Sequence, residues 1–542
     1  MPGQRRAARR SGIGPLGRGL LVSGLLVSGL LVGCSGSSPA VVAGGATAIE
    51  DVGRPPSTQP PSTGPPTTDV PTTGPPTTEL PTSGLPSTDP PTTGLPSTGP
   101  SGGTSDGDGV GDVLYPNAGN PGIDVQHYDV ALRYDPDSDE VAGTVTLDLV
   151  ITEERTGITL DIGSDVTVES VTLDGVDAAA AVDEPELRID LGRPVTAGET
   201  IAVAVTYRVD PDPIAGAFGL ESGWFDTPGG SFVLNEPDAA RSWLPSNDHP
   251  SDKATWRFTI TVAPGLTAVA NGVLVEHRAE ADGDVWVWQQ DDPMATYLVL
   301  LLTGDYEILD GSPVGDTSIV NVALRDDVER MQPYFDLHDD MIEHFEALFG
   351  PYPLTSFGAA FTDSFPSLAM ETQGRPLYSR DDFPGVVDPE QELFLAHELA
   401  HQWFGNAVSP ARWQDIWLNE GFATYGQWMW VDGVDGADLE RTAQNALEIR
   451  AMIPGSTAMP TEAELFSFTV YDGGAIVLHA LRRVLGDDAF FATLRSWVAD
   501  NTGMSRTTED FVAHVEAENP GFDDDFWDAW LYTDRPPSSY PV

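Results

Sequence analysis

A repeat rich in proline and threonine near the N-terminus limits how much of this chain can fold. Between Pro55 and Pro100 the sequence repeats short units such as Pro-Pro-Thr-Thr-Gly and Leu-Pro-Ser-Thr-Gly. Proline removes backbone donors and fixes φ, and the repeats offer few apolar side chains to bury. We therefore predict that residues 34–111 form an extended, partly polyproline-II tether. A core can form only in residues 112–542.

The residues before the tether are typical of an export signal. Four arginines lie among the first ten residues, and an apolar stretch follows at residues 20–32. That stretch is short and interrupted by Gly and Ser, which favours a signal peptide at 1–33 over a membrane span. It ends at Cys34, in a context similar to the bacterial lipobox. We predict that Cys34 carries a lipid and anchors the protein to the extracellular face of the cell membrane; the alternative is a secreted chain with an incidental cysteine.

The composition excludes some classes of protein. The formal net charge is −56, which repels phosphate backbones and argues against nucleic-acid binding. Such a charge favours a soluble chain, which we expect to be a monomer, and it says nothing about the fold. Cys34 is the only cysteine, so no intramolecular disulfide can form.

The hydrophobic period changes near residue 313. Before it, apolar and polar residues alternate at 141–151 and 200–209, and shorter β-rich runs lie at 256–262 and 297–303. This alternation predicts an all-β domain of sandwich or saddle type over residues 112–312. Beyond residue 313, apolar residues recur at helical spacing and predict a mainly helical domain over 313–542. There we expect strands near 317–324 and 357–363, and helices at 326–349, 389–405, 414–431, 436–452, 472–485 and 508–516.

The predicted helix at 389–405 contains the motif His397-Glu398-x-x-His401. Residues four apart lie on one helix face, so both imidazoles can reach one cation. Glu398 lies about 100° around the helix, beside the cation and not bound to it. A carboxylate there can act as general base on a water molecule that zinc makes more acidic. The alternative interpretation is a solvent-exposed helix whose two histidines are hydrogen-bonded and bind no metal.

A third protein ligand would leave the fourth zinc position open, as in catalytic zinc sites. Glu420 follows His401 after eighteen residues (402–419), on the next apolar helix. That spacing suits a second helix returning antiparallel against the first. We predict one zinc ion per chain, bound by His397, His401 and Glu420.

Four segments together resemble the aminopeptidase N family of zinc metallopeptidases, which includes leukotriene-A hydrolase. The family's zinc motif is similar to residues 397–406 together with Asn419-Glu420-Gly421-Phe422-Ala423. Three further segments are similar to family motifs in the family's order, at residues 236–254, 365–372 and 470–479. The resemblance spans about 112–542 and implies a thermolysin-like catalytic domain behind the β domain.

The resemblance also implies roles for individual residues. Glu398 would be the general base and later pass the proton to the leaving amine, and Tyr471 would donate a hydrogen bond to the oxyanion. Glu371, helped by Glu236, would bind the free amino group of a peptide substrate. Ala369 and Met370 would shape the backbone groove and the first side-chain pocket.

Some positions depart from the family pattern. Leu368 and Thr372 stand where the family has Gly and Asn, and Gly473 replaces a frequent Lys. Many relatives carry a large C-terminal helical-repeat domain, for which this sequence has no residues, so we expect a more open cleft. The leading hypothesis is a lipid-anchored zinc aminopeptidase. The alternatives are a thermolysin-like endopeptidase and an inactive surface-binding lipoprotein.

Overall fold

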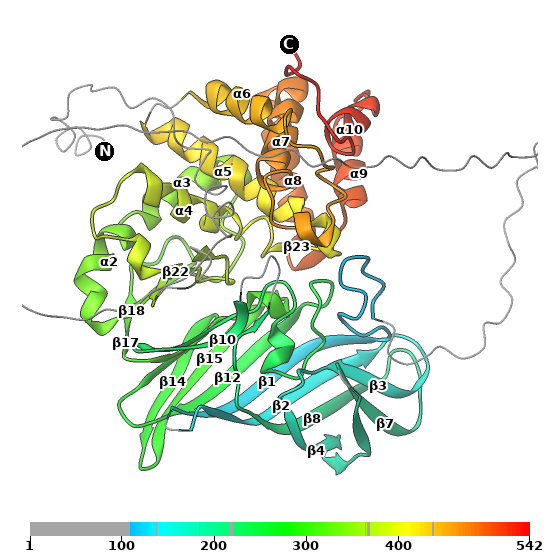
Figure 1. The fold of residues 1–542 in the computed structure, drawn as a ribbon, viewed down its shortest axis with the longest axis vertical. Helices are drawn as coiled ribbons and strands as arrows, with labels where there is room; N and C mark the ends of the chain where they lie inside the picture. Colours follow the sequence, from blue (N-terminus) through cyan, green and yellow to red (C-terminus); the bar gives the residue numbers. More distant parts are fainter. Residues whose placement is uncertain are drawn as a thin grey trace, which may run out of the picture. The chain divides into compact units, whose positions relative to one another are not determined.

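The computed structural model describes residues 109–542, except 137, 184, 216–220, 364, 366–368 and 436–437. The described residues belong to one compact unit, in which a β-rich half precedes a helical half (Figure 1). The predicted signal peptide, Cys34 and nearly all of the predicted tether lie outside the described residues, so these features stay predictions. Within 109–542, no described helix is long and apolar enough to cross a bilayer.

The largest sheet of the β-rich half has eight strands with one buried face. In β1 (Ile123–Asp135), Val130, Leu132 and Tyr134 are buried, and the residues between them are exposed. β1 runs parallel to β12, and the other neighbours in the sheet are antiparallel. The order is β14 (Val273–Glu280), β15 (Gly283–Met294), β12 (Ala254–Val262), β1, β2 (Glu140–Ile151), β8 (Thr200–Val209), β4 (Thr167–Leu173) and β5 (Val176–Asp177). The strands predicted at 141–151, 200–209 and 256–262 are confirmed.

Two smaller sheets complete the β-rich half. Their orders are β3 (Arg155–Asp161), β7 (Glu186–Val195), β6 (Ala180–Asp183), and β13 (Thr267–Ala270), β16 (Leu301–Gly304), β11 (Gly230–Leu234), β10 (Glu221–Thr227), β9 (Ile214–Ala215). A 3₁₀ turn, η2, spans Ala240–Ser242. The strand predicted at 297–303 is wrong in its first half. Thr296–Leu298 forms the 3₁₀ turn η3, closed by Leu298 N donating to Ala295 O at 3.2 Å, and the strand begins at Leu301.

The helical half begins with a sheet of its own. Its strand order is β17 (Tyr306–Asp310), β18 (Ser318–Leu324), β20 (Ala360–Thr362), β22 (Leu377–Ser379) and β21 (Ala369–Met370). A sixth strand, β19 (Ser356–Phe357), pairs with β18 outside this order. The strands predicted at 317–324 and 357–363 are present, the second in two pieces. β17, which lies before the predicted domain boundary at residue 312, pairs with β18, which lies after it.

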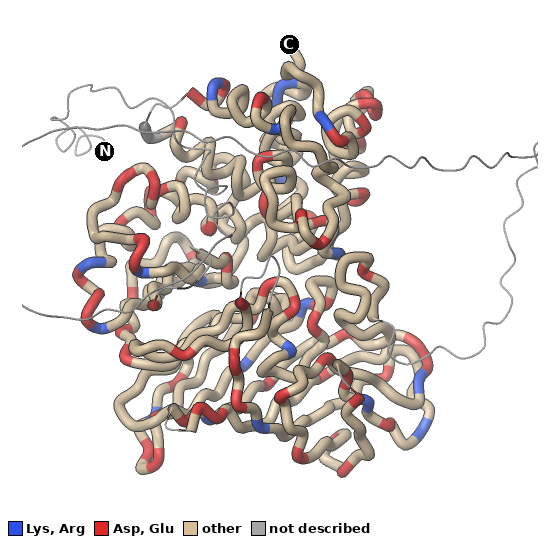
Figure 2. Tube along the Cα trace, in the orientation of Figure 1, with Lys and Arg blue, Asp and Glu red and all other residues tan. Residues whose placement is uncertain are grey.

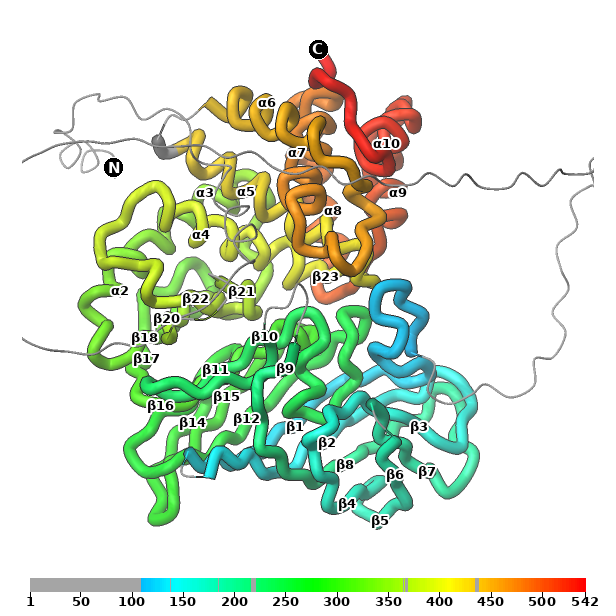
Figure 3. The backbone as a smooth tube through the Cα atoms, viewed as in Figure 1, coloured from blue at the N-terminus to red at the C-terminus, as the bar shows by residue number. Residues whose placement is uncertain are grey.

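Helices supply the rest of this half (Figure 3). They are α2 (Val328–Phe335), α3 (His338–Phe349), α4 (Pro389–Ala400), α5 (Trp417–Asp435), α6 (Leu439–Arg450), α7 (Tyr471–Leu485), α8 (Asp487–Asn501), α9 (Thr508–Glu518) and α10 (Asp525–Trp530). The 3₁₀ turns are η4 (Arg325–Asp327), η5 (Arg380–Asp382), η6 (Trp413–Asp415) and η7 (Glu462–Glu464), and β23 (Val408–Pro410) pairs with β24 (Met504–Arg506). Two of these helices, α8 and α10, were not predicted.

Two predicted helices end earlier than their apolar spacing indicates. The helix expected at 326–349 is divided into α2 and α3, and Pro333, which has no backbone N–H to donate, lies in α2 just before the break. The helix expected at 389–405 ends at Ala400. Gly405 then has φ +120°, and a Cβ there would lie 3.2 Å from His401 Nδ1. The turn after α4 therefore requires glycine at 405.

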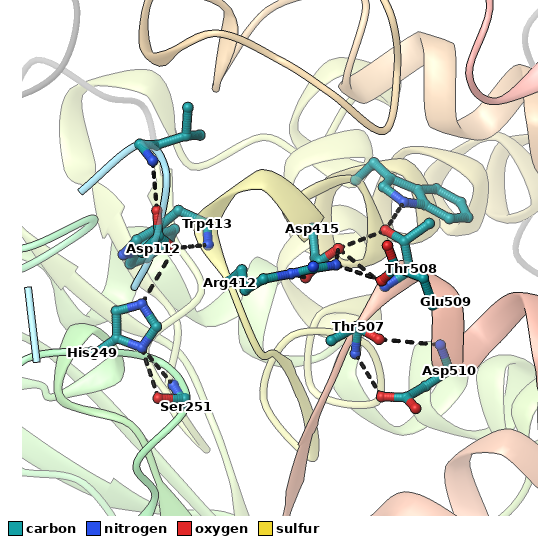
Figure 4. A network of polar contacts seen from close by, with 12 residues as sticks. Asp112, His249, Ser251, Arg412, Trp413, Asp415, Thr507, Thr508, Glu509 and Asp510 are labelled. Atoms are coloured by element: carbon teal, nitrogen blue, oxygen red, sulfur yellow. Dashed lines mark hydrogen bonds and ion pairs between the residues drawn. The ribbon is translucent and has the colours of Figure 1, made fainter. Parts of the chain in front are cut away.

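A network of polar contacts joins the two halves beside α5 (Figure 4). Asp112, from the segment that precedes β1, accepts a hydrogen bond from Trp413 N at 2.7 Å, and its carboxylate lies 3.3 Å from His249 Nε2. On the other side of η6, Asp415 accepts hydrogen bonds from the backbone and hydroxyl of Thr508. The turn that leads into α5 is thus fixed from both halves.

Acidic residues are spread along both halves of the chain (Figure 2), and most are exposed. Glu186 on β7 is an exception, because it is 3% exposed and neither carboxylate oxygen has a hydrogen-bond partner among the described residues. Its neighbour across the sheet is Asp161, which is fully buried. Burial, followed by repulsion from Asp161, raises the pKa of Glu186 to about 8. The folded protein therefore favours the protonated acid.

We expect Glu186→Gln to stabilise the protein at alkaline pH. A raised folded-state pKa means that the unfolded chain loses its proton first, so stability falls as pH rises from about 4.5 to about 8. Glutamine removes that loss. The melting temperature of the variant should exceed that of the wild type by several degrees at pH 9 and should match it at pH 5. An equal difference at both pH values would contradict the titration of Glu186.

Candidate metal and peptidase site

Helices α4 and α5 bring the three predicted zinc ligands together. His397 and His401 lie one turn apart at the end of α4, and Glu420 lies in the first turn of α5. The Nε2 atoms of His397 and His401 lie 3.2 Å and 3.4 Å from Glu420 Oε2. For metal–ligand bonds of about 2.0–2.1 Å, the edge of a ligand tetrahedron is about 3.3–3.4 Å. The three donor atoms are therefore spaced as zinc ligands are.

Each histidine is oriented by a contact to its other ring nitrogen. His397 Nδ1 lies 3.0 Å from Gln427 Oε1, and His401 Nδ1 lies 3.2 Å from the carbonyl oxygen of Phe404. Both partners are acceptors, so each Nδ1 donates a hydrogen bond, and each Nε2, on the side of Glu420, is the atom that can bind a metal ion. Gln427 is not among the predicted site residues, although it lies two helical turns after Glu420 and so on the same face of α5.

The charges around these ligands favour a cation. Burial alone would lower the pKa of His401, but the carboxylates of Glu371 and Glu420 raise it to about 10. Burial would raise the pKa of Glu420, yet His401 and His397 lower it to about 2. Among the described residues, three overlapping groups could hold a metal, and one of them combines two imidazoles with one carboxylate. That donor set suits zinc.

Glu398 lies beside the ligands and is not one of them. It belongs to a second group with Glu371 and His401, whose candidate ligand atoms all lie within 4.8 Å of one another. Its Oε2 is buried and has no hydrogen-bond partner among the described residues. Burial raises the pKa of Glu398 well above its usual range. The charge of His401 lowers this pKa, and the carboxylates of Glu371 and Glu420 raise it further. The carboxyl group is thus suited to accept a proton.

Glu236 and Glu371 form an acidic pair beside Glu420. Oxygen atoms of these three residues lie within 4.8 Å of one another. Oε1 of Glu236 and Oε1 of Glu371 are buried without a hydrogen-bond partner among the described residues. Burial is the first cause that raises the pKa of each, and for Glu236 the next is Glu371. Among the described residues, the nearest charged nitrogen to Glu371 Oε1 is His401 Nδ1, at 4.0 Å. Buried carboxylate oxygens without a hydrogen bond are a site for a positively charged donor.

Ala369 and Met370 form the short edge strand β21, directly before Glu371. β21 pairs with β22, with Met370 opposite Leu377. Met370 is buried and Ala369 is half-buried. The predicted groove residues therefore lie on a strand that leads into the acidic pair.

Tyr471 is the first residue of α7, and its ring is parallel to that of His397, with centroids 5.9 Å apart and an interplanar angle of 5°. The close approach of α7 to α5 requires glycine, because a Cβ on Gly421 of α5 would lie 2.6 Å from Gly474 Cα of α7. Burial raises the pKa of Tyr471 well above 10, and the carboxylate of Glu420 adds to the rise. The phenol therefore keeps its proton and can donate it in a hydrogen bond.

The fold and the site together define a two-domain zinc metallopeptidase. Residues 334–530 match the model of the peptidase family M1 domain, and residues 124–298 match the peptidase M1 N-terminal domain. The chain belongs to peptidase family M1, as the four motifs in the sequence predict.

Solved structures support this membership over both halves. A two-domain M1 zinc metallopeptidase mutant bound to L-arginine is 30% identical, with a TM-score of 0.74, over 80% of this chain and 100% of that one. A mutant from Deinococcus radiodurans bound to a Tyr-Ser-Ala substrate is 29% identical, with a TM-score of 0.73 and the same coverage. The predicted fold and zinc are confirmed.

Curated relatives are mostly longer than this chain. Human endoplasmic reticulum aminopeptidase 1 is 31% identical over 303 residues, which are 51% of this chain and 31% of that protein. A leukotriene A-4 hydrolase homolog from Botryotinia fuckeliana is 27% identical over 457 residues, 76% of this chain and 69% of that protein. The chain thus spans about a third of the length of the first of these relatives.

Proposed function

We propose that the protein is a zinc-dependent aminopeptidase that releases the N-terminal residue of peptides. The observation that carries this proposal is a pair of carboxylates, Glu236 and Glu371, beside the three zinc ligands. Each has a buried oxygen atom with no hydrogen-bond partner among the described residues. An ammonium group is the part of a peptide N-terminus that would satisfy them. Because the pair lies a short distance from the zinc ligands, an amino terminus bound there would bring the first peptide bond to the metal.

The chain's own residues can carry out the remaining steps. Bound zinc would supply a Lewis acid that polarises a carbonyl group and acidifies water. Glu398 would take a proton from the attacking water and transfer it to the departing amine nitrogen. Tyr471 would donate a hydrogen bond to the carbonyl oxygen as that atom becomes negative. Glu371 and Glu236 would hold the ammonium group throughout, so each cleavage removes one residue.

Hydrolysis of leucine p-nitroanilide, and of a peptide blocked by an N-acetyl group, tests the proposal. The wild type should hydrolyse the free amine substrate, a chelator should abolish this activity, and added zinc should restore it. Glu371→Ala should lower kcat/KM for the free amine by about 10²-fold, since it removes a charged partner of the ammonium group. Internal cleavage of the blocked peptide, unaffected by Glu371→Ala, would support the endopeptidase alternative. No turnover at saturating zinc would support a binding protein.

We also propose that the enzyme acts at the outer face of the cell membrane through a lipid on Cys34. The support is in the sequence alone, where the only cysteine follows an apolar stretch at residues 20–32. Partition of the native full-length protein into the detergent phase of Triton X-114 tests this. Recovery in the aqueous phase would favour simple secretion.

A further inference from the structure

The turn that follows α4, residues 404–407, is held by side chains from the β domain. The Gly405 carbonyl oxygen accepts a hydrogen bond from Tyr297 OH at 3.0 Å. The carbonyl oxygens of Asn406 and Ala407 accept hydrogen bonds from Lys253 Nζ at 2.6 Å and 3.1 Å. Three successive carbonyl groups of this turn therefore accept hydrogen bonds from η3 and from the residue before β12. The turn also accepts from the helical half, Gly405 from Ser409 Oγ and Ala407 from Gly503 N.

The same turn contacts the zinc site and the acidic pair. Its first carbonyl oxygen, on Phe404, accepts from His401 Nδ1. The side chain of Asn406 donates from Nδ2 to the carbonyl oxygen of Glu371 at 2.7 Å. A shift of the turn would thus change both the orientation of a zinc ligand and the position of the carboxylate proposed to bind the substrate's amino group.

Lys253 is the only lysine in the chain. It lies immediately before β12 and is half-buried, with its ammonium group on the 404–407 turn of the helical half. Burial lowers its pKa to about 7, with the carboxylate of Asp292 partly offsetting that change. An ammonium group in such a position is costly unless it is hydrogen-bonded, and here its bonds go to the 404–407 turn.

Tyr297 lies in η3 and reaches the second zinc helix as well as the turn. It is 1% exposed. Its hydroxyl accepts a hydrogen bond from Asn419 Nδ2 at 3.2 Å, and Asn419 directly precedes Glu420. One phenol therefore joins the turn that orients His401 to the start of the helix that carries Glu420.

We propose that Lys253 and Tyr297 are positioning residues of the peptidase site. Lys253 fixes, through Asn406, the segment that presents Glu371 to the substrate's amino group. Tyr297 fixes the zinc ligands relative to one another through the 404–407 turn and Asn419. Through these two residues the β domain supports the site without touching the reacting atoms. This inference rests on the proposed aminopeptidase function.

Two inhibitors that differ by one amino group test the role of Lys253. Leucine hydroxamate has an amino group, and 4-methylpentanohydroxamate has the same skeleton without it; both have a zinc-binding hydroxamate. Lys253→Met should weaken binding of leucine hydroxamate about tenfold or more, and binding of the amine-free inhibitor by less than about threefold. Equal weakening of both inhibitors, or of neither, would overturn the role of Lys253.

Ser505→Ala is the matched control. Ser505 Oγ donates to the carbonyl oxygen of Pro250 at 2.6 Å, so this variant removes another contact between the halves close to Lys253. It should change neither inhibitor constant. If Lys253→Met fails to fold, Asn406→Ala serves instead, because it removes the amide that holds Glu371 and keeps Lys253. It should show the same selective loss for leucine hydroxamate.

Zinc affinity tests the role of Tyr297. Tyr297→Phe should lower the affinity for zinc about tenfold in competition with a chelator, as loss of an outer-shell contact does. Tyr306→Phe is the control, because Tyr306 is also buried and its hydroxyl contacts Thr362 Oγ1 at 2.7 Å. Unchanged zinc affinity in Tyr297→Phe would overturn its role.

Different results would contradict the proposed function and the positioning roles. A wild type that binds zinc but cleaves no free-amine substrate, and prefers neither hydroxamate, contradicts the proposed function itself. A wild type that prefers leucine hydroxamate, with variants that behave like their controls, contradicts only the positioning roles of Lys253 and Tyr297.

Discussion

Glu398→Gln should lower kcat by about 10³–10⁴-fold, near the upper limit for the loss of a general acid–base group. Glutamine has nearly the same shape, so α4 and the two histidines on it should keep their places. It is neutral and cannot accept the proton of the attacking water or transfer that proton to the leaving nitrogen. We therefore expect a folded, zinc-loaded protein with almost no turnover of leucine p-nitroanilide.

Metal analysis and kinetics on the same sample separate loss of the base from loss of the metal. The variant should contain zinc at the wild-type ratio, and Glu390→Gln, an exposed residue at the start of α4, should keep full activity. Activity of Glu398→Gln within about tenfold of the wild type would exclude Glu398 as general base. Zinc loss would instead show that Glu398 supports the metal site.

The features that could be predicted from the sequence are local ones. The period of two in β2 and β8 depends on which face of one strand is buried, and neighbouring residues show it. The pairing of His397 with His401 follows from the pitch of a single helix. The prediction of Glu420 as a ligand depended on a second helix. Because that helix follows soon after the first, few arrangements of the two helices are possible. The structure brings these residues together, and few other contacts decide where they lie.

The features that could not be predicted depend on contacts between distant segments. Lys253 contacts the carbonyl oxygens of residues more than 150 positions away, and the hydrophobic period around it does not indicate that contact. Gly421 and Gly474 are ordinary helical glycines in the sequence, yet their close approach brings α7 to α5. The end of α4 at Ala400 was missed for the same reason, since the turn is held by groups from the β domain.

Tyr471→Phe should lower kcat by roughly 10²–10³-fold, the usual effect of removing one donor to an oxyanion. The ring packs parallel to that of His397, and phenylalanine can keep that contact. Only the hydroxyl is lost, so zinc content should not change and KM should change by less than about threefold, because the hydrogen bond strengthens in the transition state.

A second tyrosine provides the control for losing a hydroxyl in this region. Tyr425 of α5 is buried, and its hydroxyl lies 3.2 Å from His479 Nδ1. Tyr425→Phe should therefore affect stability more than kcat. If Tyr471→Phe keeps the wild-type kcat, Tyr471 has no part in the chemistry. If it raises KM and leaves kcat unchanged, the hydroxyl binds the substrate in its ground state, and stabilisation of the oxyanion must then come from the metal alone.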